Sequence, residues 1–161
     1  MVSEVSLLMD RAENEIHAAQ VLKKASEDVS LKKDLGFSQE STFYSNVIGH
    51  SYYSIFYSAK AYLISKSIIF KSEQGQHQQV YFEFRKLVQA GIIDNELLNI
   101  YEEALDKAEV LLEIIKEEKK KRKTFTYETI PQANKKPAED SIKNALFFHT
   151  HIKNFLQNSE I

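Results

Sequence analysis

The residues best suited to chemistry form a basic run that ends a predicted helix. Six of the eight residues from 116 to 123 are cationic, and Tyr127 follows Arg122 by five positions. An arginine can hold a phosphate through two parallel hydrogen bonds, and a nearby tyrosine can donate a hydrogen bond or stack on a base. Cations at a helix C-terminus also complement the helix dipole, so a structural role is the alternative interpretation. The candidate phosphate-binding residues are Lys119, Lys120, Lys121, Arg122 and Lys123.

A second candidate group is a cluster of aromatic residues between residues 44 and 62. Tyrosine rings can stack on unpaired bases, which makes Tyr53 a candidate nucleic-acid contact. The helical spacing of the cluster also fits packing in a core or a dimer interface, because tyrosine can bury its ring and keep its hydroxyl in water. The cluster consists of Tyr44, Tyr52, Tyr53, Phe56, Tyr57 and Tyr62.

Several classes of catalytic and metal site are excluded by what the sequence lacks. There is no cysteine for a thiol nucleophile or a thiolate zinc site, and no glycine-rich phosphate loop or nucleophile elbow. The paired Glu-x-x-His motifs of di-iron bundles are missing as well. Glu13 and His17 have the spacing of a surface pair, and His149 falls on an apolar stripe, as a core histidine would. We therefore expect neither a metal nor a cofactor.

Long amphipathic helices are the elements that have to position these residues. The 161 residues include only four glycines and two prolines, too few for the many turns of a β-sandwich or barrel. Apolar residues recur at three- and four-residue steps through most of the chain. The pattern predicts one domain over residues 1–161, an all-α bundle of four to five helices. The expected helices cover residues 3–25, 42–66, 76–90, 95 into the basic run 116–123, and 137–156, with one short helical turn near 31–35.

Capping residues and breaks mark several of the predicted helix ends. Ser3 and Asp94 suit N-terminal positions, Gly91 suits a C-cap, and Pro137 suits a first turn. The helix over residues 42–66 has the widest apolar stripe, so we expect it to be the most buried element. Residues 124–134 break the helical pattern and predict an extended loop, a kind of segment that often carries function.

Overall charge and hydropathy limit the partners. The formal net charge of -2 argues against bulk coating of nucleic acid and leaves only the local basic run for polyanions. The first ten residues lack the basic flank and apolar run of a leader, and no stretch approaches the ~20 apolar residues that cross a bilayer. We expect a cytoplasmic protein without a membrane partner.

Four stretches of the chain carry a family-like pattern. They are HSYYSIFYSAKAYLISK from His50 to Lys66, KSEQGQH from Lys71 to His77, the segment 84–93, and Arg122 with Tyr127. Together they resemble the HEPN (higher eukaryotes and prokaryotes nucleotide-binding) domain, over most of the chain. The resemblance implies an up-and-down, HEPN-like bundle that forms a homodimer, with the arginine motifs of two subunits in a shared basic cleft. It also implies RNA or nucleotide binding in a toxin-antitoxin or defence system, with a minimal nucleotidyltransferase as partner.

The motif departs from that of the nuclease branch of this family. There a histidine follows the arginine, whereas here Tyr127 stands in that place, as in a branch with an arginine-x4-tyrosine motif. Thr126 occupies the aspartate position of that branch, Glu73 replaces a loop histidine, and His77 matches a second one. Tyrosine, with an ordinary pKa near ~10, is a poor base at neutral pH. A metal-independent endoribonuclease toxin using Arg122, Tyr127 and His77 stays an alternative, as does a purely protein-binding partner of a nucleotidyltransferase.

Overall fold

Helices make up all of the regular structure in the described part of the chain. The computed structural model describes the backbone of residues 2–121 and 135–159, and the side chains of residues 2–109 and 135–159. These ranges contain no strand, which confirms the predicted all-α bundle. The helices are α1 (Glu4–Glu27), α2 (Val29–Asp34), α3 (Tyr44–Ser65), α4 (Gln76–Gln89), α5 (Asn95–Lys121) and α7 (Lys135–Asn158).

The number of helices differs from the expected four to five, because six occur within the described residues. The additional one is α2, which forms where only a single helical turn was expected. Asp28 ends α1 and begins α2, since its backbone N–H donates to Lys24 O and its side chain accepts from Leu31 N. One residue therefore separates the two helices, and α1 extends two residues beyond its predicted end.

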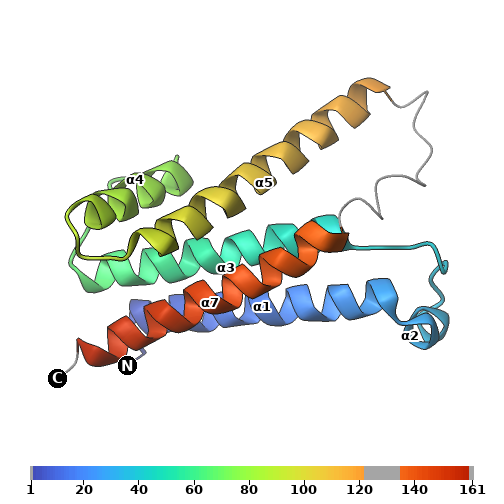
Figure 1. Cartoon of the computed structure of the whole chain (residues 1–161), viewed down its shortest axis with the longest axis horizontal. Coiled ribbons are helices and arrows are strands. Elements are labelled where there is room, and N and C mark those ends of the chain that lie inside the picture. Colours follow the sequence, from blue (N-terminus) through green and yellow to red (C-terminus); the bar gives the residue numbers. More distant parts are fainter. Residues whose placement is uncertain (1, 122–134, 160–161) are drawn as a thin grey trace.

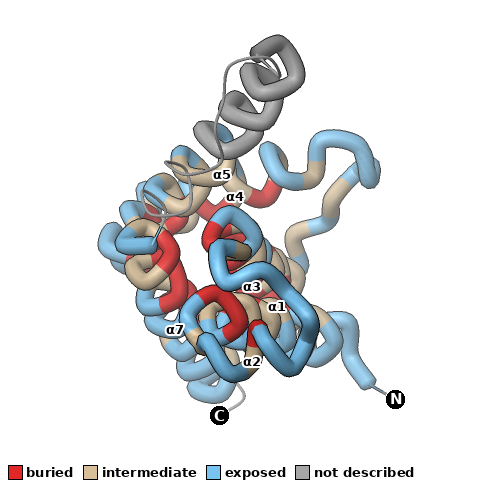
Figure 2. The backbone as a smooth tube through the Cα atoms, turned by 90° about the vertical axis from the view of Figure 1, so that its right-hand side faces the viewer, coloured by how far each residue is buried: buried red, intermediate tan, exposed pale blue. Residues whose placement is uncertain are grey.

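The four longest helices alternate in direction along the bundle (Figure 1). α3 lies at the centre and packs against α1, α4, α5 and α7. It is rich in buried residues, as its wide apolar stripe predicted. Seen from the end of the bundle, the buried segments of the helices face one another and the exposed segments face outward (Figure 2). The core contains Ile16 of α1, Phe56 of α3, Phe84 of α4, Tyr101 of α5 and Phe148 of α7.

Most predicted caps are found at the ends of these helices. Ser3 caps α1, where its hydroxyl oxygen accepts from Ser6 N at 3.1 Å. Gly91 follows the last turn of α4 with a φ of +75°, a conformation that glycine adopts at little cost. Asp94 directly precedes α5, and Pro137 lies in the first turn of α7. The predicted loop 124–134 lies outside the described residues.

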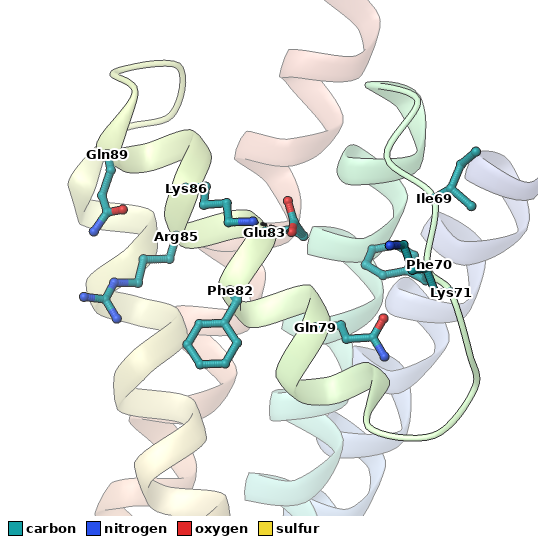
Figure 3. A pocket seen from close by; sticks show the side chains of 9 residues that line it. All are labelled: Ile69, Phe70, Lys71, Gln79, Phe82, Glu83, Arg85, Lys86 and Gln89. Carbon is teal, nitrogen blue, oxygen red and sulfur yellow. Dashed lines mark hydrogen bonds and ion pairs between the residues drawn. The ribbon is translucent and has the colours of Figure 1, made fainter.

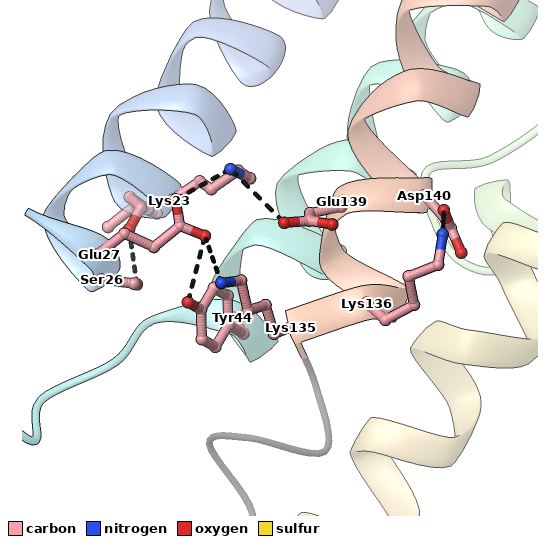
Figure 4. A network of polar contacts seen from close by, with 9 residues as sticks. Lys23, Ser26, Glu27, Tyr44, Lys135, Lys136, Glu139 and Asp140 are labelled. Atoms are coloured by element: carbon pink, nitrogen blue, oxygen red, sulfur yellow. Dashed lines mark hydrogen bonds and ion pairs between the residues drawn. The ribbon is translucent and has the colours of Figure 1, made fainter.

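A polar network joins the ends of three helices where α7 begins (Figure 4). Glu27 of α1 accepts a hydrogen bond from Lys23 at 3.0 Å and one from Tyr44 of α3 at 3.3 Å. Lys135 lies 3.9 Å from Glu27, and Lys23 lies 3.9 Å from Glu139, both across to α7. Burial alone would raise the pKa of Glu27, but the two lysines and Tyr44 together lower it. This network connects the first turn of α7 to the end of α1 and the start of α3. Among the described residues, no helix combines the length and hydropathy of a membrane span.

Candidate nucleic-acid interface

The predicted arginine motif cannot be assigned a geometry. Arg122, Lys123 and Tyr127 lie outside the described residues. The backbone of Lys119, Lys120 and Lys121 is described as the last turn of α5, but their side chains are not. The candidate site is therefore built from the two predicted residues that the structure does describe, Tyr53 and His77. These two residues come from different helices and meet at the crossing of α3 and α4.

His77 is the second residue of α4 and lies against the middle of α3. Its ring stacks on Phe56, with ring centroids 4.1 Å apart and an interplanar angle of 17°. Its Nδ1 lies 2.9 Å from the hydroxyl oxygen of Tyr52. Phe56 and Tyr52 are buried, whereas His77 remains exposed on the side away from them. Two buried side chains thus hold one face and one nitrogen of an exposed imidazole.

The local environment sets the protonation states of this pair. Burial, and to a smaller extent Tyr53 and Glu109, raise the pKa of Tyr52 to about 12. Burial and the charge of Lys60 lower the pKa of His77. Near neutral pH the phenol of Tyr52 therefore keeps its proton and the imidazole is uncharged.

Exposed aromatic rings continue from His77 along α3. Tyr53 is 41% exposed, meets the His77 ring edge-on at 5.7 Å, and stacks on Tyr57 with centroids 6.2 Å apart. Arg11 of α1 lies over the Tyr57 ring, with its guanidinium carbon 4.5 Å from the ring centroid. We call Arg11, Tyr53, Tyr57 and His77 the aromatic strip. Because rings and guanidinium groups stack on unpaired bases, the strip has the chemistry of a nucleotide contact.

Cations near the strip are few and already have contacts. Lys60 donates to Gln76 Oε1 at 2.9 Å and lies 6.0 Å from the centroid of the Phe70 ring. Its ammonium group is close enough to His77 to lower the pKa of the imidazole. Sequence reasoning missed Arg11 and Lys60, because only the packing of α1 and α4 on α3 brings Arg11 to Tyr57 and His77 near Lys60. The spacing of four residues between Tyr52 and Phe56 was the available signal that one face of α3 holds both.

His149 and His50 contact side chains of neighbouring helices, whereas His17 is exposed. His149 is 7% exposed, and its Nδ1 lies 3.1 Å from Ser58 Oγ, which confirms the predicted core position. His50 pairs with Glu15 across α1 and α3. Glu13 and His17 are both exposed. Within the described residues, no group of three or more His, Asp or Glu side chains could hold a metal ion.

A shallow groove of about 540 Å³ lies elsewhere, along the outer side of α4 (Figure 3). Ile69, Phe70 and Phe82 supply its apolar surface, and Lys71 lies beside Phe70 on the preceding loop. Lys86 at its edge is paired with Glu83 at 2.7 Å. None of the four residues of the aromatic strip lines this groove, so the two surfaces are separate.

Comparison with protein-family models, with curated proteins and with solved structures finds no match to this chain.

Proposed function

We propose that the chain is a HEPN-type module that binds RNA or a nucleotide through a basic cleft, with Arg122 and its neighbouring lysines contacting phosphate. It works as a homodimer in a toxin-antitoxin or defence system, with a minimal nucleotidyltransferase as partner. The observation that carries the proposal is the aromatic strip, in which Tyr53 and His77 present exposed rings on top of buried Tyr52 and Phe56. Exposed rings backed by rigid packing are suited to stacking on bases.

Charge supports a local rather than a general affinity for nucleic acid. The chain as a whole has a formal net charge of -2, whereas the run 116–123 has six cationic and two acidic residues. Phosphate contacts supply most of the affinity of nucleic-acid binding, and stacking supplies a smaller, salt-insensitive part. The lysine run and the strip would thus make different contributions to the same ligand.

Binding is favoured over catalysis by the groups available. Tyr127 has replaced the histidine of the nuclease branch, and a phenol is a weak base near neutral pH. Ribonuclease activity nonetheless has a direct test, which is cleavage of RNA in the presence of EDTA by the wild type and its loss in Arg122→Ala. Intact RNA in both reactions would remove the endoribonuclease alternative.

The binding proposal is tested by measuring RNA affinity across a salt series for the wild type and Arg122→Ala. Loss of one charge-assisted phosphate contact is expected to weaken binding roughly 10-fold or more and to make the salt dependence shallower by about one unit. Arg85→Ala is the matched control, because Arg85 is an exposed arginine on the outer side of α4 and is expected to leave affinity unchanged. Equal affinities of the wild type and Arg122→Ala would show that the proposed phosphate contact is wrong.

A further inference from the structure

The contact between Tyr52 and His77 decides what the exposed nitrogen of His77 can do. A neutral imidazole has one nitrogen that donates and one that accepts, and the partner of one nitrogen fixes the role of the other. The Nδ1 of His77 lies 2.9 Å from the Tyr52 hydroxyl oxygen. The direction of this hydrogen bond therefore determines whether Nε2 carries a proton or a lone pair.

The direction follows from the surroundings of the Tyr52 hydroxyl. Tyr52 is 6% exposed, and His77 is its only hydrogen-bond partner among the described residues. If Nδ1 carried the proton, the phenolic hydrogen would have no acceptor among the described residues, which is unfavourable for a side chain as buried as Tyr52. If the phenol donates to Nδ1, both groups are satisfied. The raised pKa of Tyr52 and the lowered pKa of His77 keep the phenol protonated and the imidazole neutral, in agreement with this arrangement.

We propose that Tyr52 fixes His77 as the Nε2–H tautomer, so that His77 donates a hydrogen bond to a phosphate oxygen of a bound nucleotide. The stack on Phe56 fixes the plane of the ring, and Nε2 has no partner among the described residues. Lys60 adds a positive charge nearby that favours an anionic acceptor. The ligand class rests on the proposed function, whereas the tautomer does not.

This assignment changes the part that His77 plays at the site. A general base needs a lone pair that faces the substrate, and the Nε2–H tautomer presents a proton there instead. His77 is therefore a binding residue that touches the ligand, and Tyr52 is a positioning residue that acts through it. A ribonuclease at this site would need another base.

The tautomer can be read directly by two-bond proton–nitrogen correlation NMR of the ligand-free protein at about pH 8, where imidazole is neutral. The expected spectrum shows a protonated Nε2 and an unprotonated Nδ1 for His77. In Tyr52→Phe the spectrum is expected to shift toward a mixture of the two tautomers, because the donor to Nδ1 is gone. A wild-type spectrum with the proton on Nδ1, or an unchanged spectrum in Tyr52→Phe, would overturn the proposal.

The donor role is tested with three proteins and a short single-stranded oligouridylate. His77→Gln keeps an N–H at the position of Nε2 and is expected to bind within about threefold of the wild type, whereas His77→Ala is expected to lose roughly 10-fold or more. Circular dichroism checks that both variants fold. Binding by His77→Gln that is as weak as that of folded His77→Ala, or wild-type affinity in His77→Ala, would contradict a donor.

A ribose-phosphate oligomer without bases identifies the acceptor. If His77 donates to phosphate, the loss caused by His77→Ala is expected to remain about 10-fold with this oligomer. Disappearance of the loss would exclude phosphate as the acceptor. Absence of RNA binding by the wild type would overturn the proposed function and the ligand class together, while the NMR spectrum decides the tautomer separately.

Discussion

His149 and His77 differ in how their surroundings constrain them. His149 lies on the buried side of α7, 3.1 Å from Ser58 of α3. Burial lowers the pKa of His149, with a smaller lowering by Lys153 and an opposing effect of Glu13. The unfolded chain therefore binds a proton at this position at a higher pH than the folded chain does.

This difference predicts that His149 destabilises the fold as the pH falls. Its stabilising contribution is complete above the ordinary pKa of 6.5 and is lost as the pH drops through the lower pKa of the folded state. We expect His149→Asn to be less stable overall but to show a shallower decline of unfolding free energy between about pH 7 and about pH 5. Urea denaturation at several pH values measures both quantities.

The control for this prediction is His17→Asn, because His17 is an exposed histidine on α1. Its decline with pH is expected to match that of the wild type. An unaltered slope in His149→Asn would mean that other groups cause the acid sensitivity.

Residue-level prediction from sequence succeeded where a single helix decides the environment. The apolar stripe of α7 was enough to predict that His149 is buried. The partners of His77 were not predicted, because they depend on where α4 crosses α3, and helix periodicity carries no information about crossing points. The roles of Arg122 and Tyr127 remain predictions, since both lie outside the described residues.

At the scale of elements, α3 and α4 end in the same hydrogen-bond pattern but with different residues at the critical position. After α4, Ile92 N donates to Leu87 O at 2.9 Å, and the left-handed residue is Gly91. After α3, Ile68 N donates to Leu63 O at 3.1 Å, and the left-handed residue is Ser67, with a φ of +63°. A side chain in this conformation carries a steric cost that glycine avoids.

We therefore expect Ser67→Gly to stabilise the protein by a net of about 0.5–1 kcal/mol. Relief of the steric cost contributes roughly 1–2 kcal/mol, and the greater freedom of glycine in the unfolded chain offsets roughly 0.5–1 kcal/mol of it. Gly91→Ala is the matched reverse change and is expected to cost about 1 kcal/mol, because a Cβ there meets no atom within 4 Å and only the backbone conformation is penalised. Thermal denaturation of both variants measures the effect. A loss of stability in Ser67→Gly would contradict the steric explanation.

Helix positions were predictable to within a few residues, because periodicity and caps are local signals. The predicted end of α1, at residue 25, is two residues too early. In the structure Ser26 Oγ donates to Leu22 O and accepts from Phe43 N, which ties the last turn of α1 to the start of α3. That contact spans 17 residues of sequence and leaves no mark on the local pattern.

At the scale of the whole molecule, one core cluster draws residues from all five of the longer described helices. Within this cluster the ring of Phe148 of α7 contacts α4 and α5, with its centroid 5.4 Å from that of Phe84 and 6.0 Å from that of Tyr101. The single domain over residues 1–161 stays a prediction, made from the length and helical pattern of the chain. Tyr52 and Phe56, on which the aromatic strip packs, belong to the same core cluster as residues of α1 and α7.

A core cluster shared by all five of the longer described helices predicts that the chain unfolds in one cooperative step. Far-UV circular dichroism and tyrosine fluorescence are expected to give the same urea midpoint, and the chain contains eight tyrosines and no tryptophan to report on packing. Phe148→Ala is expected to lower both midpoints together, at a cost of roughly 3–5 kcal/mol, because it opens a cavity between α4, α5 and α7. Phe82→Ala, at a 45% exposed site on α4, is expected to cost less than about 1 kcal/mol. Midpoints that separate in Phe148→Ala would mean that α4 and α5 fold independently of the other helices, and the aromatic strip would then lie at a boundary between two units.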